Sequence, residues 1–171
     1  ALSWHLTAWH GTYTTFDSLW PMLTAADVDG FEAELAPWVI PVNNVLSADT
    51  SGNISFQLRG RIVERPSANR WIPVPGSDAH AWTDLEAVPY ERMHHWRNPD
   101  TGFIVTANNR ISESGPYVSL DFANAARYDR VVALLSALDP TRTDVAAMAA
   151  IHLDVTSLVA LEVLPLFLAA T

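Results

Sequence analysis

The sequence contains no cysteine, few basic residues and no apolar run long enough to cross a membrane, and each absence excludes a class of protein. Without cysteine the chain can form neither a disulfide nor a thiolate metal site, which leaves its compartment undecided. Lys and Arg number 10 against 19 Asp and Glu, for a formal charge of −9. Binding to nucleic acid or to an anionic membrane needs clustered cations, so we expect neither as a partner.

Charged residues of either sign are also scarce. They make up 17% of the chain and hydrophobic residues 49%, whereas about 25% of a typical soluble domain is charged. Part of the apolar surface is therefore expected to lie in an interface. The most apolar segment, residues 155–170, contains Glu162 and Pro165 and is shorter than the roughly 20 residues of a spanning helix, which favours a buried helix.

The patterns that are present predict helices and strands, arranged in four parts along the chain. Residues 1–65 are expected to hold a helix and a hairpin, and residues 66–101 a long loop rich in Pro and Trp. Residues 102–124 read as a strand with a polar loop, and residues 125–171 as helices.

Local signals define the expected elements of the first part. Residues 1–20 alternate in part, which suggests a strand and a turn, and a helix is predicted over residues 25–38 with Thr24 as its N-cap. The turn residues Asp49–Asn53 separate two apolar runs and predict a hairpin.

The C-terminal part carries three helical patterns. They are predicted, in chain order, at residues 125–138, at residues 144–153 after a Thr143 cap, and at residues 157–168.

No recognised metal, phosphate or nucleophile motif is present. His94 and His95 are adjacent, so their side chains point in different directions, and we interpret them as a loop pair. His5 and His10 stand beside Trp4 and Trp9, which favours aromatic packing. The Asp49–Asn53 stretch lacks the acidic residue that closes a calcium loop and is expected to be a turn. We therefore assign no metal ligand.

One stretch has an unusual composition. The β-branched run Phe103–Thr106 leads directly into Asn108, Asn109 and Arg110. Asn is depleted in strands and favoured in turns, so the pair marks a strand end that presents side-chain amides. A fixed Asn amide can donate an N–H to a developing oxyanion in acyl transfer.

Four blocks extend this observation over nearly the whole chain. In order they are "NNVLSADTSGNISFQLRGRI", "WIPVPGSDAHAWTDLEAVPYERMHHWRNPDTGFIVTANNRI", "LDFANAARYDRVVALLSA" and "MAAIHLDVTSLVALEVLPLFL". Together they resemble successive blocks of the penicillin acylase (penicillin amidase) family of N-terminal nucleophile (Ntn) hydrolases. The resemblance implies that residues 1–171 are a single α+β segment, part of a four-layer αββα sandwich with antiparallel sheets, plus C-terminal helices.

The resemblance also implies an activity. Members of the family cleave themselves into an α and a β chain, and the new N-terminal Ser of the β chain is the nucleophile, with its own α-amino group as the base. The expected reaction is hydrolysis of the amide bond of N-acylated small molecules such as β-lactam antibiotics or acyl-homoserine lactones.

Site residues are carried over position by position. Asn108 matches the oxyanion-hole amide of the family, and Arg127 matches an arginine that orients this Asn and the amine of the nucleophile. These two are the expected catalytic residues. Trp20 and Asn43 fall where the family has residues lining the acyl pocket, and they are the expected substrate-binding residues.

The chain begins with Ala1, which has no nucleophilic side chain. We therefore expect an internal segment of a β chain that is inactive alone and whose partners are the α chain and the rest of the β chain. No cofactor is expected, although the complete protein could hold a structural calcium ion, as relatives do. Relatives are mostly periplasmic or secreted, which is the localisation that the resemblance implies.

Two alternatives remain open at this point. Seven tryptophans could form the ligand-stacking face of a stand-alone binding module. The chain could also be a structural relative that keeps the fold and has lost catalysis.

Overall fold

The computed structural model describes residues 3–65, 67–70, 72–80 and 86–170. The single segment expected from the sequence divides into two compact units. The first comprises residues 1–104 and 112–121, and the second residues 105–111 and 122–171. Each unit is described by itself.

The first unit is built around a three-stranded antiparallel sheet in the order β1-β2-β3. Its strands are β1 (Asn43–Ala48), β2 (Ile54–Arg59) and β3 (His95–Arg97). Strands β1 and β2 form the predicted hairpin, with Ala48 opposite Ile54 at its closed end. The Asp49 carboxylate accepts hydrogen bonds from the backbone N–H groups of Ser51 (2.9 Å) and Asn53 (3.0 Å), so the turn predicted here is confirmed.

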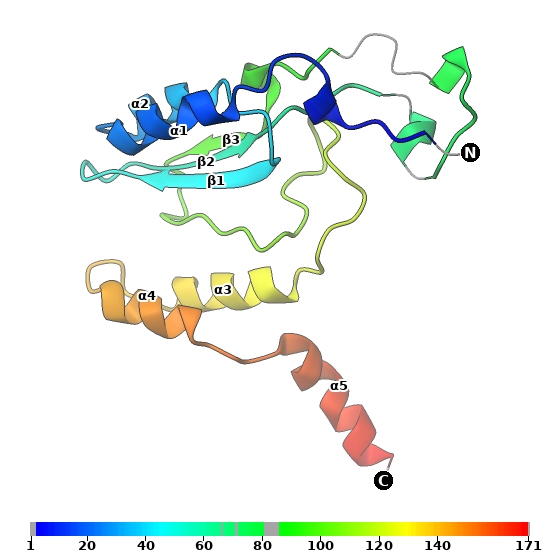
Figure 1. Ribbon diagram of the computed structural model, residues 1–171. Coiled ribbons are helices and arrows are strands. Elements are labelled where there is room, and N and C mark those ends of the chain that lie inside the picture. Colours follow the sequence, from blue (N-terminus) through cyan, green and yellow to red (C-terminus); the bar gives the residue numbers. More distant parts are fainter. Residues whose placement is uncertain (1–2, 66, 71, 81–85, 171) are drawn as a thin grey trace. The chain divides into compact units, whose positions relative to one another are not determined.

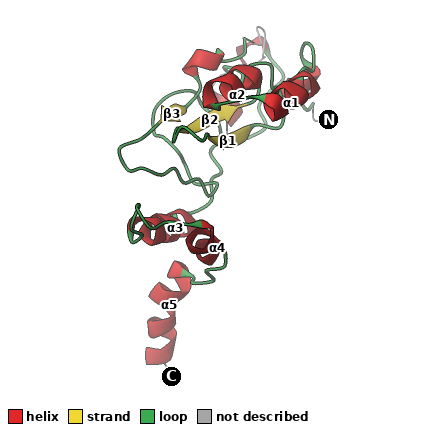
Figure 2. Cartoon of the chain, turned by 90° about the vertical axis from the view of Figure 1, so that its left-hand side faces the viewer, coloured by secondary structure: helices red, strands yellow, loops and turns green. Residues whose placement is uncertain are grey.

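Two helices cover one side of this sheet, as Figures 1 and 2 show. They are α1 (Thr15–Thr24) and α2 (Val28–Leu35), and a short 3₁₀ turn, Thr7–Trp9, precedes them. The strand predicted within residues 1–20 is wrong, because residues 3–20 contain a 3₁₀ turn and the start of α1 and no strand. Small polar residues anchor α1, because the Thr15 hydroxyl accepts from the N–H of Val39 (3.0 Å) and Ser18 is fully buried.

The helix predicted over residues 25–38 is shorter than expected. Thr24 ends α1, and Asp27 caps α2 by accepting the Gly30 N–H at 2.8 Å, so the Thr24 cap is wrong. The carboxylate of Asp27 suits a helix N-terminus better, because the unpaired N–H groups there favour a negative charge.

Strand β2 has a polar and an apolar face. Ser55 and Arg59 point toward α2: the Ser55 hydroxyl donates to the Glu32 carboxylate, and Arg59 Nε donates to the Leu35 carbonyl at 2.7 Å. Phe56, on the opposite face, is 1% exposed and packs on Trp96 with ring centroids 4.5 Å apart. Alternation along the strand separates the two faces, so the helices lie over the polar one.

Two expectations for the middle of the chain need correction. Strand β3 lies inside residues 66–101, which were expected to form a loop, and pairs with β2 through Trp96 opposite Phe56. The strand predicted at residues 103–106 is absent from the described sheet, whose three strands are β1 to β3. β-branched residues favour a strand only where a neighbouring strand receives them, and this segment does not join the sheet.

Three helices form most of the second unit. They are α3 (Ala126–Ser136), α4 (Val145–His152) and α5 (Leu158–Ala169), close to the predicted ranges. Asp144, one residue beyond the predicted Thr143, caps α4, and Ser157 caps α5. None of the residues in these three helices is buried. In the described part of the chain, no helix combines the length and apolar character needed to span a membrane.

Candidate active-site residues

Asn108 adopts a left-handed backbone conformation, with φ of +61°. Among residues with a side chain, Asn is one of the few that tolerate this region. The Asn108 carbonyl accepts the Ala123 N–H at 2.9 Å, which ties the segment to the start of the helical region. The side chain of Asn108 is exposed, so its amide is accessible in this chain.

Arg127, in the first turn of α3, contacts this segment. Its Nη2 donates to the Ala107 carbonyl at 2.7 Å and to Asn108 Oδ1 at 3.1 Å. A guanidinium has donors and no acceptor, so the oxygen of the Asn108 amide must face Arg127. The Nδ2 group is then left to donate elsewhere. The structure thus brings the two residues expected to be catalytic into direct contact.

Asn109 behaves differently from its neighbour. It is half-buried, its Oδ1 accepts the Ala107 N–H at 3.0 Å, and its Nδ2 donates to the Arg110 carbonyl at 3.1 Å. Both ends of this amide are therefore used by the local backbone. The sequence alone does not distinguish the two asparagines, because the difference lies in backbone conformation.

The residues expected to bind substrate lie in the other unit. Trp20 is in α1 with 74% of its surface exposed. Asn43 opens β1, pairs with Arg59 of β2 and is exposed.

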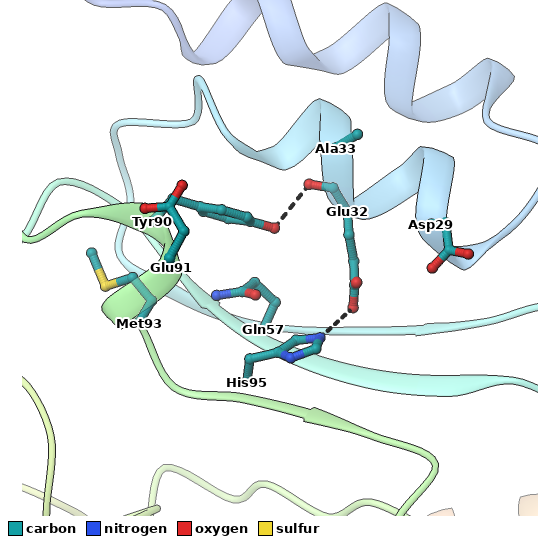
Figure 3. Close-up of a pocket in the computed structure, with 8 residues that line it drawn as sticks. All are labelled: Asp29, Glu32, Ala33, Gln57, Tyr90, Glu91, Met93 and His95. Carbon is teal, nitrogen blue, oxygen red and sulfur yellow. Dashed lines mark hydrogen bonds and ion pairs between the residues drawn. The ribbon is translucent and has the colours of Figure 1, made fainter.

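A pocket of about 330 Å³ lies between α2 and β3 in the first unit (Figure 3). Glu32 lines this pocket. Its carboxylate contacts three groups: His95 Nε2 at 3.0 Å, Arg97 Nη1 at 3.4 Å and the Ser55 hydroxyl. Arg97 also pairs with Asp29 at 3.0 Å. Acidic residues of α2 therefore bind His95 and Arg97 of β3, which indicates a structural link between α2 and β3.

Tyr90 lines the same pocket. Its hydroxyl donates to the Glu32 carbonyl at 2.9 Å, and the Arg59 guanidinium lies 5.1 Å from its ring centroid. Burial, followed by the charge of Glu32, raises the pKa of Tyr90, and burial lowers the pKa of Arg59. Sequence reasoning missed this cluster, because its members come from three distant segments that share no motif.

His94 and His95 are not the loop pair expected from the sequence, because His95 belongs to strand β3 and pairs with Gln57 of β2. His95 points to Glu32, whereas the ring of His94 stacks on that of Trp96 with ring centroids 6.2 Å apart. The two adjacent side chains therefore point in different directions. Burial lowers the pKa of His94. The rings of His5 and His10 pack 5.0 Å apart. Among the described residues, no three His, Asp or Glu side chains gather closely enough to hold a metal ion.

The described tryptophans do not share one face. Trp4 and Trp9 pack edge to face, Trp20 projects from α1, and Trp96 packs on Phe56 of β2. Trp38 donates its indole N–H to the Pro41 carbonyl at 2.8 Å. Trp71 and Trp82 lie outside the described residues.

Comparison with known proteins identifies the family of the chain. The family model described as penicillin amidase matches residues 1–171. The chain belongs to the penicillin amidase family. It is also 34% identical over 149 residues to the penicillin acylase 2 proenzyme of Pseudomonas sp. (strain SE83), a match that covers 85% of this chain.

A solved structure supports the same fold. The thermostable penicillin G acylase from Alcaligenes faecalis matches with a TM-score of 0.65 and 20% identity over 77% of this chain. The mixed helices and small antiparallel sheet agree with the α+β class expected from the family. The chain spans about a fifth of the Pseudomonas proenzyme (19%) and about a quarter of the Alcaligenes chain (24%).

Proposed function

We propose that this chain is part of an amidohydrolase that removes an acyl group from an amide, releasing a carboxylate and an amine. The N-acylated substrates would be small molecules such as β-lactam antibiotics or acyl-homoserine lactones. The nucleophile would be the N-terminal serine of a processed β chain, supplied by sequence outside these residues. Family membership supports an acylase, and the substrate range and nucleophile are part of the proposal.

The contact between Arg127 and Asn108 carries this proposal. Arg127 Nη2 lies 3.1 Å from Asn108 Oδ1 and 2.7 Å from the Ala107 carbonyl oxygen. With its oxygen engaged by a cation, the Asn108 amide offers Nδ2 as a donor of fixed direction. One oriented donor of this kind stabilises an oxyanion by about 3 kcal/mol in acyl transfer.

The proposed reaction has two halves. The serine oxygen attacks the amide carbonyl carbon while its proton passes to the α-amino group, and Asn108 Nδ2 donates to the oxyanion that forms. The C–N bond then breaks and the leaving amine takes that proton. Water hydrolyses the resulting ester by the same route, giving the carboxylate and restoring the serine. Arg127 acts through Asn108 as a positioning residue.

Trp20 and Asn43 are proposed to line the pocket that receives the acyl group. Trp20 is 74% exposed and could supply apolar area to an acyl chain. Asn43 would make the pocket partly polar.

The other assignments follow from the same family membership. We propose that the rest of the α and β chains pack around this segment, because this chain spans only about a fifth to a quarter of the relatives it matches. A structural calcium ion in the complete protein is part of the same proposal. Self-cleavage of a precursor and a periplasmic or secreted location belong to the proposal as well.

The test is to express the complete polypeptide that contains this chain and to measure intact masses and amide hydrolysis. Suitable probes are the p-nitroanilides of phenylacetic, decanoic and glutaric acids, which represent aromatic, aliphatic and dicarboxylic acyl groups. A processed chain beginning with serine, together with release of p-nitroaniline from at least one probe, is the expected result. An unprocessed chain without turnover on all three would contradict the proposal.

A further inference from the structure

The turn at residues 107–110 places two asparagines side by side with different surroundings. Asn108 is exposed and its Nδ2 is directed away from Arg127, whereas Asn109 is half-buried. Only one of the two amides can serve a substrate, since the amide of Asn109 is engaged at both ends. What Asn109 does in the site is therefore a separate question.

The Asn109 side chain forms hydrogen bonds to the backbone on both sides of Asn108. Its Oδ1 accepts from the Ala107 N–H at 3.0 Å, before Asn108, and its Nδ2 donates to the Arg110 carbonyl at 3.1 Å, after Asn108. The two bonds connect the backbone on either side of the one residue with φ of +61°. A residue held in a sparsely populated backbone region keeps that conformation only when its surroundings enforce it.

Two further hydrogen bonds of this turn act on backbone carbonyl groups. Arg127 Nη2 binds the Ala107 carbonyl at 2.7 Å, and the Ala123 N–H binds the Asn108 carbonyl at 2.9 Å. Asn109 alone among these contacts binds the Ala107 N–H. Asn109 thus binds the N–H group of Ala107, and Arg127 binds its carbonyl group. Rotation of the backbone at Ala107 would move the Asn108 amide.

We propose that Asn109 is a positioning residue for the amide of Asn108, an inference that rests on the proposed acylase function. It fixes the left-handed turn from which Asn108 Nδ2 reaches the developing oxyanion, without contacting the substrate itself. Loss of the two Asn109 hydrogen bonds shifts Asn108 Nδ2 relative to the reacting carbonyl. A displacement of about 1 Å can cost about 100-fold in rate.

The experiment compares Asn109→Ala with Asn109→Asp in the complete processed enzyme, using whichever p-nitroanilide is turned over. Asn109→Ala removes both bonds, and we expect kcat to fall about 10- to 100-fold with little change in KM. Asn109→Asp keeps an acceptor for the Ala107 N–H and is expected to retain more of kcat than the alanine variant.

Asn98→Ala is the matched control. Asn98 Oδ1 accepts the Ile54 N–H at 2.8 Å and its Nδ2 donates to Asn53 at 3.0 Å, so this asparagine also uses both ends of its amide. It directly follows β3 in the first unit, whereas the turn at 107–110 belongs to the second. The control should lower thermal stability and leave kcat unchanged.

The outcomes separate the inference from the function it rests on. An unchanged kcat in Asn109→Ala, or a loss that disappears when the variant is assayed well below its unfolding temperature, would overturn the positioning role. If Asn109→Ala fails to fold, Asn109→Asp decides, because it keeps the bond to the Ala107 N–H and loses the bond to the Arg110 carbonyl. A fall in kcat with unchanged KM supports the positioning role, and a kcat equal to that of wild type overturns it. Failure of the proposed function is recognised separately, by absence of turnover in the wild-type enzyme.

Discussion

Arg127 and Asn108, 19 residues apart in the sequence, share a hydrogen bond of 3.1 Å between Nη2 and Oδ1. The same Nη2 reaches the Ala107 carbonyl at 2.7 Å, so one guanidinium group fixes both the side chain and the preceding peptide of the proposed oxyanion donor. The orientation of the Asn108 amide follows from this contact, because Arg cannot accept a hydrogen bond.

Arg127→Met is expected to lower kcat by at least about tenfold in the complete enzyme, since the Asn108 amide would be free to rotate. Arg127→Lys should recover part of this loss, because an ammonium group can reach one of the two acceptors but lacks the planar fork. Steady-state kinetics on a p-nitroanilide substrate provides the measurement. Equal kcat in wild type and Arg127→Met would contradict a positioning role for this arginine.

Glu32 is predicted to hold α2 to β3. Its carboxylate contacts His95, Arg97 and Ser55. Glu32→Ala should lower the free energy of unfolding by about 2 kcal/mol, because these partners lose a charged hydrogen-bond acceptor. Denaturant unfolding of the complete protein tests this. Glu34→Ala, on the same helix but outside the pocket lining, is the control and should have a much smaller effect.

Asp154 joins the loop after α4 to α3. Its carboxylate accepts from Arg130 Nε at 2.9 Å and from Nη2 at 2.6 Å, and this hydrogen bonding by Arg130 lowers the pKa of Asp154 from 3.8 to about 2. A depressed pKa stabilises the fold above the ordinary pKa, and the contribution is lost as the pH falls through the folded value. The Asp154→Asn variant should therefore melt below wild type at neutral pH.

Thermal melting as a function of pH checks this expectation. The difference between wild type and Asp154→Asn should be constant above about pH 4 and shrink toward zero near pH 2. Arg130→Gln should lower the melting temperature as well, and adding Asp154→Asn to it should cost little more, because the pair acts as a unit. A difference that persists unchanged at pH 2 would show that the ion pair is not its source.

Asp49 is predicted to set the hairpin turn. The side chain of Asn53 and then its backbone N–H lower the pKa of Asp49 by binding the carboxylate. Asp49→Ala should reduce the melting temperature by roughly 2–4 °C, whereas Asp49→Asn keeps an acceptor oxygen and should lose less. If both variants melt like wild type, the turn depends on Gly52 and the strands alone.

Local chemistry explains which elements could be predicted. The hairpin was predictable because its turn residues and alternating apolar residues agree. Two of the C-terminal helices were predictable because an apolar run follows a capping residue, Asp144 for α4 and Ser157 for α5. α1 was missed because its aromatic residues face solvent in this structure: Phe16 is 71% exposed and Trp20 74%. Thr15 and Ser18, which read as loop residues, form its buried side.

Long-range contacts explain the rest. Strand β3 is three residues long and depends on pairing with β2, and the Glu32 cluster joins segments 63 and 65 residues apart. The Asn108–Arg127 pair was identified from family resemblance, and the sequence alone offered only an amide after an apolar run. The separate role of Asn109 became visible only through the backbone conformation at Asn108.

The measurement that tests the central claim most directly is the kcat of Asn108→Gly in the complete enzyme. Glycine adopts a φ of +61° without a steric penalty, so this variant removes the amide donor while the turn is kept. We predict a fall in kcat of about 100- to 1,000-fold with a melting temperature close to that of wild type. Turnover at the wild-type rate by a folded Asn108→Gly enzyme would contradict the account.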